Sequence, residues 1–228
     1  ICNSRMVRDE ILAHFAIDPG KLHVIYSGVD LTRFRPAGAE ERRAARARFG
    51  LTEEVPVFLF LGSGYARKGL ATALAALARL PRQARLLVVG RDRRETRYRR
   101  LAQRLGVAGR VLFLGPMTDV LPCYHAADAL VLPTLYDPFP NVALEALACG
   151  LPVITSAHCG AAEILTEGVT GYVCDALDAA GVAAAMAALC DPARRDTMRQ
   201  AARACAERFD TDTAPHALID LYQRLLAR

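Results

Sequence analysis

Short runs of apolar residues alternate with stretches of helical periodicity through the middle of the chain. The apolar runs predict six strands, at residues 55–61, 84–89, 111–114, 129–132, 153–156 and 171–174. Helices are predicted between them at residues 69–80, 94–105, 120–126 and 142–149. Strands that alternate with helices indicate βαβ units, and strands that are apolar at every position are typical of a parallel sheet buried on both faces. We therefore predict an α/β fold, a doubly wound parallel sheet with helices on both faces.

The two ends of the chain have different patterns. Residues 1–16 predict a helix with an apolar stripe, and either Asn3 or Ser4 is placed to cap its start. Residues 23–36 predict a short strand followed by an irregular loop that a proline closes. From about residue 176 the pattern is helical in three segments, and an Asp-Pro pair separates two of them.

Basic residues exceed acidic ones, which gives a formal net charge of +5 carried by 27 arginines and two lysines. Eight of the arginines fall within residues 91–110, where Tyr98 is the only aromatic residue. A surface for single-stranded nucleic acid interleaves basic residues with stacking aromatics, so we do not predict a nucleic-acid partner. We interpret the basic stretch as a solvated helix face, and a surface for an anionic membrane or partner is the alternative.

The seven cysteines are scattered, and they form neither a CxxC pair nor a Cys/His cluster with the spacing of a zinc site. We interpret them as reduced, mostly buried thiols. The sequence contains no apolar run of the length that spans a bilayer and no secretory signal pattern at its start. A cytoplasmic location is therefore our default expectation.

The loop that follows the first predicted strand reads GSGYARKG, residues 62–69, and opens a predicted helix. In a doubly wound sheet, ligands bind beyond the carboxyl ends of the strands, so this loop is a candidate site. Its glycines allow the backbone to approach a ligand closely. Arg67 and Lys68 are expected at the first turn of this helix, where their positive charges oppose its positive end, which is unfavourable unless an anion accompanies them. A diphosphate is the anion that suits this arrangement, whereas an exposed, solvated Arg-Lys pair is the simpler alternative.

A second candidate segment reads YDPFPNVALEALACG, residues 136–150. Its two prolines predict that Asp137 lies in a rigid loop, and Asn141 is placed to cap the helix that follows. Glu145 stands on this otherwise apolar helix, and a carboxylate in such surroundings requires polar partners. Two carboxylates suit hydroxyl-rich groups such as a ribose and a hexose. The alternative for Glu145 is a structural ion pair with a core arginine.

With these segments in view, the chain resembles a known family. The segment from Asp137 to Glu145 resembles the E-x7-E motif of retaining GT-B glycosyltransferases, family four, with Asp in place of the first Glu. Further similar strings occur in order along the chain: ICNSRMVRDEI, VIYSGVDLTRFRP, FLGSGYARKG, LLVVG, VLFLG, AADALVLPTLYDPFPNVALEALACGLPVI and GVTGYV. GSGYARKG and SAHCGAAE together most resemble the lipopolysaccharide-core glucosyltransferases that use UDP-glucose.

The resemblance implies the C-terminal, Rossmann-like half of a GT-B enzyme, which binds the nucleotide sugar. Arg67, Lys68 and Asp137 would be catalytic, the two cations neutralising the departing diphosphate and Asp137 holding the transferred hexose. The other implied nucleotide-sugar-binding residues are Gly62, Ser63, Gly64, Arg91, Met117, Phe139, Pro140, Asn141, Val142 and Glu145. Among these, Glu145 would hold the ribose, Arg91 and Met117 would lie near the base, and the segment 139–142 would offer backbone N–H groups, except at Pro140. No metal and no cofactor is implied.

Residues 1–38 are expected to be a linker from an N-terminal domain that this chain lacks. Residues 39–210 are expected to form the donor-binding domain, and residues 211–228 a return helix. The missing domain would carry the site for a glycan or glycolipid acceptor, so we expect this chain alone to bind donor without transferring sugar. For the whole enzyme, peripheral association with the cytoplasmic face of the inner membrane stays open. Two alternatives also stay open, a non-catalytic nucleotide-sugar-binding module and a non-hydrolysing sugar-nucleotide epimerase.

Overall fold

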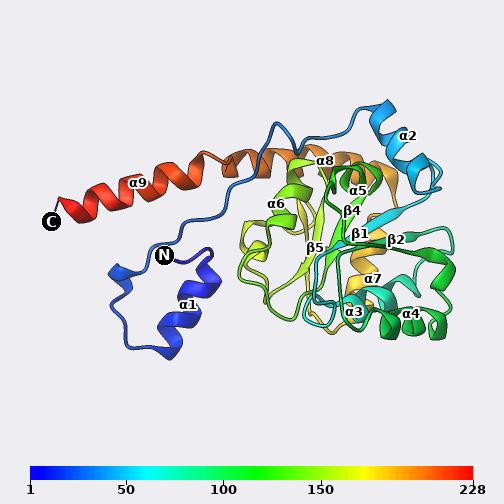
Figure 1. Cartoon of the computed structure of the whole chain (residues 1–228), viewed down its shortest axis with the longest axis horizontal. Helices are drawn as coiled ribbons and strands as arrows, with labels where there is room; N and C mark the ends of the chain where they lie inside the picture. Colours follow the sequence, from blue (N-terminus) through cyan, green and yellow to red (C-terminus); the bar gives the residue numbers. More distant parts are fainter. Residues whose placement is uncertain (228) are drawn as a thin grey trace.

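The structure, a computed structural model that describes residues 1–227, contains one sheet of six parallel strands (Figure 1). The strands are β1 (Val57–Leu61), β2 (Arg85–Val89), β3 (Val111–Gly115), β4 (Ala129–Leu132), β5 (Val153–Ser156) and β6 (Gly171–Cys174). Their order across the sheet is β3-β2-β1-β4-β5-β6. Every pair of neighbouring strands is parallel, and the register joins Phe58 to both Leu86 and Ala129. The predicted doubly wound sheet is confirmed.

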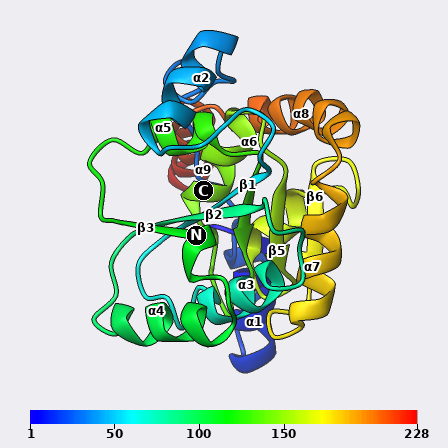
Figure 2. The same ribbon diagram turned by 90° about the vertical axis from the view of Figure 1, so that its right-hand side faces the viewer.

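Helices cover both faces of this sheet, as Figure 2 shows along its edge. The helices are α1 (Arg5–His14), α2 (Ala39–Arg48), α3 (Leu70–Leu77), α4 (Glu95–Arg104), α5 (Leu121–Ala126), α6 (Asn141–Ala148), α7 (Ala179–Ala188), α8 (Pro192–Ala206) and α9 (Thr213–Leu226). Short 3-10 helices occupy Pro19–Lys21 (η1), Ala108–Arg110 (η2), Gly160–Ile164 (η3) and Glu207–Phe209 (η4). One buried apolar cluster joins the sheet to α2, α5, α6 and α8, and a second joins it to α3, α4 and α7. The core therefore consists of two layers, one on each face of the sheet.

Two elements differ from the prediction. The helix α2 was not predicted, because its sequence AEERRAARAR has no apolar stripe and buries only Ala45 and Arg46. The short strand predicted within residues 23–36 does not form. Val24 and Val29 make only isolated bridges, to Cys2 and Asp210 respectively, so no ladder of hydrogen bonds develops there.

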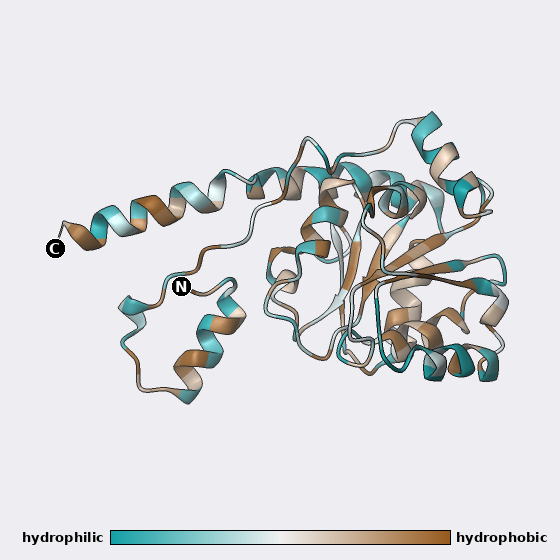
Figure 3. Cartoon of the chain, in the orientation of Figure 1, coloured by the Kyte–Doolittle hydropathy of each residue, from teal (hydrophilic) through white to brown (hydrophobic). Residues whose placement is uncertain are grey.

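The two ends of the chain project from the body on the same side (Figure 1). Ser4 caps α1 as one of the two predicted candidates, since its hydroxyl accepts a hydrogen bond from the Val7 N–H. The last helix, α9, carries apolar side chains that are about half exposed, at Ile219, Tyr222 and Leu225. Figure 3 shows brown, apolar segments along α9 and on α1. Among residues 1–227, no helix has the length and apolar character needed to cross a membrane.

A buried carboxylate fixes the helices at the amino end of the sheet. Asp128, immediately before β4, is fully buried and accepts hydrogen bonds from Arg42 at 2.6 Å, Arg46 at 2.9 Å and the Val57 N–H at 2.8 Å. Arg195 of α8 lies 3.4 Å from the same carboxylate. Burial lowers the pKa of Arg46, and the charge of Asp128 opposes this shift. Asp128 thus joins α2 and α8 to the starts of two central strands.

We predict that Asp128→Asn lowers the free energy of unfolding by about 3–5 kcal/mol, because it leaves the buried guanidinium of Arg46 without a compensating charge. Urea denaturation of the chain measures this change. The matched control is Asp119→Asn, since the Asp119 side chain is 62% exposed and lies 3.7 Å from Arg33. The control should lose less than about 1 kcal/mol. Equal losses of unfolding free energy in the two variants would show that the Asp128 cluster stabilises the fold no more than a surface ion pair does.

Candidate functional site

The strand order reverses between β1 and β4, and this is the point at which α/β sheets bind ligands. From β1 the chain passes to α3 on one face, and from β4 it passes to α6 on the other. The connections after these strands therefore leave for opposite faces of the sheet, and we call the region between the two loops at the carboxyl edge the crevice. The loops at residues 62–69 and 133–140 flank it, and the predicted site residues come from these loops, from α6 and from the loops after β2 and β3.

The glycine-rich loop after β1 is hydrogen-bonded to the loop after β2. The Arg91 N–H donates to the Ser63 hydroxyl at 3.2 Å, and the Gly64 N–H donates to the Arg91 carbonyl at 3.2 Å. A Cβ atom at Gly90 would lie 2.3 Å from the carbonyl oxygen of Gly62, so only glycine permits this approach. The structure thus brings together four of the predicted residues, Gly62, Ser63, Gly64 and Arg91.

The two predicted cations meet the predicted carboxylate across the crevice. The Lys68 Nζ donates to the Asp137 Oδ2, and the Arg67 Nη1 donates to the same oxygen at 2.9 Å. Lys68 and Asp137 are buried, whereas half of the Arg67 side chain is exposed. The arrangement contains two positive charges and one negative charge, so one positive charge is left for a bound anion.

This geometry corrects part of the prediction for the loop. Arg67 and Lys68 precede the helix rather than lying in its first turn, because α3 begins at Leu70 with Gly69 as its N-cap. The anion that accompanies them in the fold is the carboxylate of Asp137, in addition to any ligand. The simpler alternative of an exposed, solvated pair is also wrong for Lys68, which is only 8% exposed.

Backbone contacts hold the two loops together around this ion pair. The Leu135 N–H donates to the Arg67 carbonyl at 2.7 Å, and the Thr134 hydroxyl donates to the same oxygen at 3.0 Å. Gly69 has φ of +79°, and a Cβ atom there would lie 1.9 Å from the Pro133 carbonyl oxygen. The loop after β1 therefore cannot separate from the loop after β4 without breaking several contacts.

The start of α6 presents backbone donors to the crevice. Pro140 is the N-cap and Asn141 is the first helical residue, so the expected capping by the Asn141 side chain is wrong. Within residues 1–227, the N–H groups of Phe139, Asn141 and Val142 donate to no protein acceptor. The Phe139 ring is buried, 5.4 Å from the ring of Tyr26, which fixes the loop before the helix. Three predicted backbone donors are thus free to bind an anion.

Glu145 lies just over one turn inside α6 and is half-buried. Its Oε2 accepts a hydrogen bond from the Tyr124 hydroxyl at 2.6 Å. Burial raises the pKa of Glu145, and the Tyr124 hydrogen bond and the charge of Arg33 partly oppose this shift. Among the described residues no arginine lies within ion-pair distance of Glu145, so the predicted alternative of a core ion pair is not found. The sulfur of Met117 lies 3.5 Å from that of Cys123, the residue before Tyr124.

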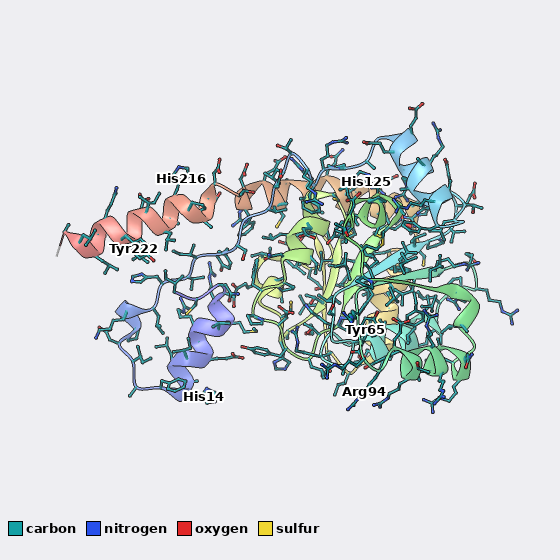
Figure 4. The ribbon with its side chains drawn as sticks, in the orientation of Figure 1. His14, Tyr65, Arg94, His125, His216 and Tyr222 are labelled. Carbon is teal, nitrogen blue, oxygen red and sulfur yellow. The ribbon has the colours of Figure 1, made fainter. Side chains whose placement is uncertain are left out.

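A hollow of about 380 Å³ lies beside the glycine-rich loop. Its lining consists of Gly64, Ala66, Arg91, Asp92, Arg93, Arg94, Arg97 and Tyr98. Figure 4 labels Arg94 at the lower edge of the domain, below Tyr65. The lining contains two predicted site residues, Gly64 and Arg91, but not Lys68, Asp137 or Glu145. The hollow is therefore adjacent to the crevice rather than the crevice itself.

Two features of the site were not predicted. The first is Tyr124, whose partner Glu145 lies 21 residues away and could not be assigned from local periodicity. The second is the attachment of α1 to the site loops. Glu163 in η3 accepts hydrogen bonds from the Arg5 N–H at 2.9 Å, and the hydroxyl of Tyr136 donates to Glu10 at 2.7 Å. In residues 1–227, no group of three or more His, Cys, Asp or Glu side chains is arranged to hold a metal ion.

A parallel sheet with a switch point flanked by a glycine-rich loop, two cations and free helix N–H groups is typical of α/β proteins that bind phosphorylated ligands. The family model described as "Glycosyl transferases group 1" matches residues 41–204. This match covers most of the chain, so the chain belongs to that family. The predicted fold class, one Rossmann-like half of a GT-B architecture, is confirmed.

Relatives support this assignment. A D-inositol 3-phosphate glycosyltransferase from Xylanimonas cellulosilytica is 34% identical over 100% of this chain and 57% of its own length. Sucrose-phosphate synthase from Thermosynechococcus elongatus is 32% identical with a TM-score of 0.86, over 99% of this chain and 58% of that one. WaaG, a glycosyltransferase involved in lipopolysaccharide biosynthesis, is 27% identical with a TM-score of 0.86, over 96% and 61%. The chain thus spans little more than half the length of such relatives.

We predict that Asp137→Asn lowers the free energy of unfolding by about 1–3 kcal/mol, because it leaves the buried Lys68 ammonium without its anion. Millimolar pyrophosphate should stabilise this variant more than the wild type, since the added anion replaces the missing charge. Urea denaturation with and without pyrophosphate measures both effects. The control is Asp9→Asn, whose side chain is 60% exposed. If pyrophosphate stabilises all three proteins equally, Lys68 and Arg67 are not an anion site.

Proposed function

We propose that this chain is the donor-binding part of a retaining glycosyltransferase, which moves a hexose from a UDP-glucose-like nucleotide sugar to a cell-envelope glycan or lipopolysaccharide-core acceptor. The observation that carries the proposal is the convergence at one switch point of two cations, three free N–H groups and a carboxylate one helical turn further on. The family match makes a transferase a better candidate than the related epimerase or a non-catalytic module.

In this proposal, Arg67 and Lys68 bind the diphosphate together with the N–H groups of Phe139, Asn141 and Val142. The positive charge in excess at Lys68 and Arg67 would stabilise the leaving group as negative charge develops on it. Asp137, which holds both cations in place, would also be the group nearest the transferred hexose. Because Asp137 would both position the two cations and contact the hexose, a substitution at Asp137 should displace Arg67 and Lys68 as well as weaken the contact with the sugar.

The nucleoside would occupy the flanks of the crevice. Glu145 would accept hydrogen bonds from the ribose hydroxyls, a role that suits a half-buried carboxylate with one occupied oxygen. Arg91 and Met117 would lie near the base, with the backbone of residues 62–64 beside the phosphates. We propose that no metal is required, because the two cationic side chains supply the positive charge that a metal ion supplies elsewhere.

A second candidate acceptor has a specific observation in its favour. A relative matched over the whole chain is named a D-inositol 3-phosphate glycosyltransferase, and its 34% identity exceeds the 27% of WaaG. A phosphorylated polyol is therefore an acceptor class to set beside the lipopolysaccharide core. We propose that the acceptor is bound by residues outside this chain, in a cytoplasmic enzyme whose peripheral association with the inner membrane would suit a glycolipid acceptor.

We predict that UDP or UDP-glucose stabilises the chain without added metal. Binding to the folded state should add about 1–3 kcal/mol, which corresponds to a rise in melting temperature of roughly 3–8 °C for a domain of this size. A thermal-shift series with the UDP, GDP and ADP forms of glucose in the presence of a chelator measures the effect and identifies the base.

Two variants make this measurement specific to the proposed site. Lys68→Ala should remove most of the stabilisation by nucleotide, whereas Lys21→Ala should retain it. Lys21 is the matched control, because it is the chain's other lysine and is exposed in η1. The donor-site proposal would be abandoned if no nucleotide sugar shifts the wild type at millimolar concentration, or if both variants respond as the wild type does.

A further inference from the structure

Tyr124 and Glu145 form the shortest tyrosine–carboxylate contact beside the crevice. The Tyr124 hydroxyl lies 2.6 Å from the Glu145 Oε2 and 3.4 Å from the Val142 carbonyl oxygen. A hydroxyl has one proton to donate, and the shorter distance to a carboxylate shows where it goes. Oε2 of Glu145 is thus occupied inside the protein, and Oε1 is the oxygen left to accept hydrogen bonds from outside.

The hydroxyl is carried by a ring that is packed on all sides. Tyr124 is fully buried in α5, and its ring meets the Phe34 ring edge-to-face at 5.8 Å and 90°. Figure 4 labels His125, the next residue of α5, in the upper part of the domain. Burial, reinforced by the neighbouring Glu145, raises the pKa of Tyr124 well above its ordinary value, so the hydroxyl keeps its proton. The donor is therefore held by packing on both its ring and its helix, and it is protonated at neutral pH.

Glu145 has few other polar contacts to orient it. Val142 and Ala148 on α6 and Cys149 at its C-cap, which lie three or four positions from Glu145 and so share its face of the helix, are apolar. A carboxylate that turns freely about its last bond loses rotational freedom when a ligand fixes it, and this loss weakens binding. A carboxylate already fixed through one oxygen does not have this cost.

We propose that Tyr124 is a positioning residue for ribose recognition, which holds Glu145 so that its free oxygen faces the vicinal hydroxyls of a ribonucleotide donor. This inference rests on the proposed function, in which Glu145 binds the ribose. It predicts that Tyr124 determines selectivity for ribose over deoxyribose without touching the nucleotide. The hydroxyl of Tyr124 acts only through Glu145. The selectivity for ribose over deoxyribose therefore depends on this hydroxyl, whereas the affinity for the diphosphate does not.

The test compares the dissociation constants of UDP and 2′-deoxy-UDP, or of the corresponding pair for the base that binds best, by calorimetry on the 228-residue chain. The wild type should prefer the ribose form by roughly tenfold, the usual effect of one hydrogen bond to a charged group. Tyr124→Phe should reduce this preference to about twofold by weakening UDP alone. Tyr172→Phe is the matched control, because it removes a tyrosine hydroxyl from β6, at the edge of the sheet, and should keep the full preference.

The outcomes distinguish a failure of the inference about Tyr124 from a failure of the proposed ribose role of Glu145. If Tyr124→Phe weakens both nucleotides equally, or keeps the tenfold preference while Glu145→Ala loses it, Tyr124 is structural and the inference fails alone. If the wild type shows no preference, or Glu145→Ala retains it, the ribose role of Glu145 fails and the inference with it. If Tyr124→Phe does not fold, Phe34→Leu replaces it, since this change loosens the Tyr124 ring and should reduce the same preference by about half. A full preference in Phe34→Leu would overturn the inference.

Discussion

The ion pair of Asp137 with Lys68 and Arg67 is the interaction on which the candidate site depends. It joins the loops after β1 and β4, two neighbouring strands whose connections leave for opposite faces of the sheet. Without a contact between them, these loops would diverge and the crevice would have no defined width. One carboxylate between two cations holds the two loops together and still leaves a positive charge for a bound anion. The close approach of Gly69 to Pro133 strengthens the same junction.

Charge is divided between the two ends of the sheet. At the amino end, Asp128 is enclosed by arginines of α2 and α8 and serves only to hold the fold. At the carboxyl end, the charged groups are partly open, and the N–H groups at the start of α6 have no protein acceptor among residues 1–227. The Asp128 cluster stabilises the fold at the amino end of the sheet, and the charged groups at the carboxyl end are left available for a ligand.

The strands and most helices could be predicted, because apolar runs and helical periodicity reflect burial directly. The candidate site could be predicted in part, since Lys68, Asp137 and Glu145 stand in unusual local contexts. Their partners could not, because contacts such as Asp137 with Lys68 and Glu145 with Tyr124 join residues far apart in the chain. The helix α2 was not predicted, because it is held by the buried Arg46 and has no apolar stripe that a sequence pattern could reveal.

The most direct test of the central claim is a crystal structure of the chain with the nucleoside diphosphate that stabilises it best. We expect the diphosphate to lie against Lys68 and Arg67 and to accept hydrogen bonds from the N–H groups at the start of α6, with the ribose at Glu145. A nucleotide bound instead in the arginine-lined hollow beside Arg94 and Arg97, away from Asp137, would contradict the account.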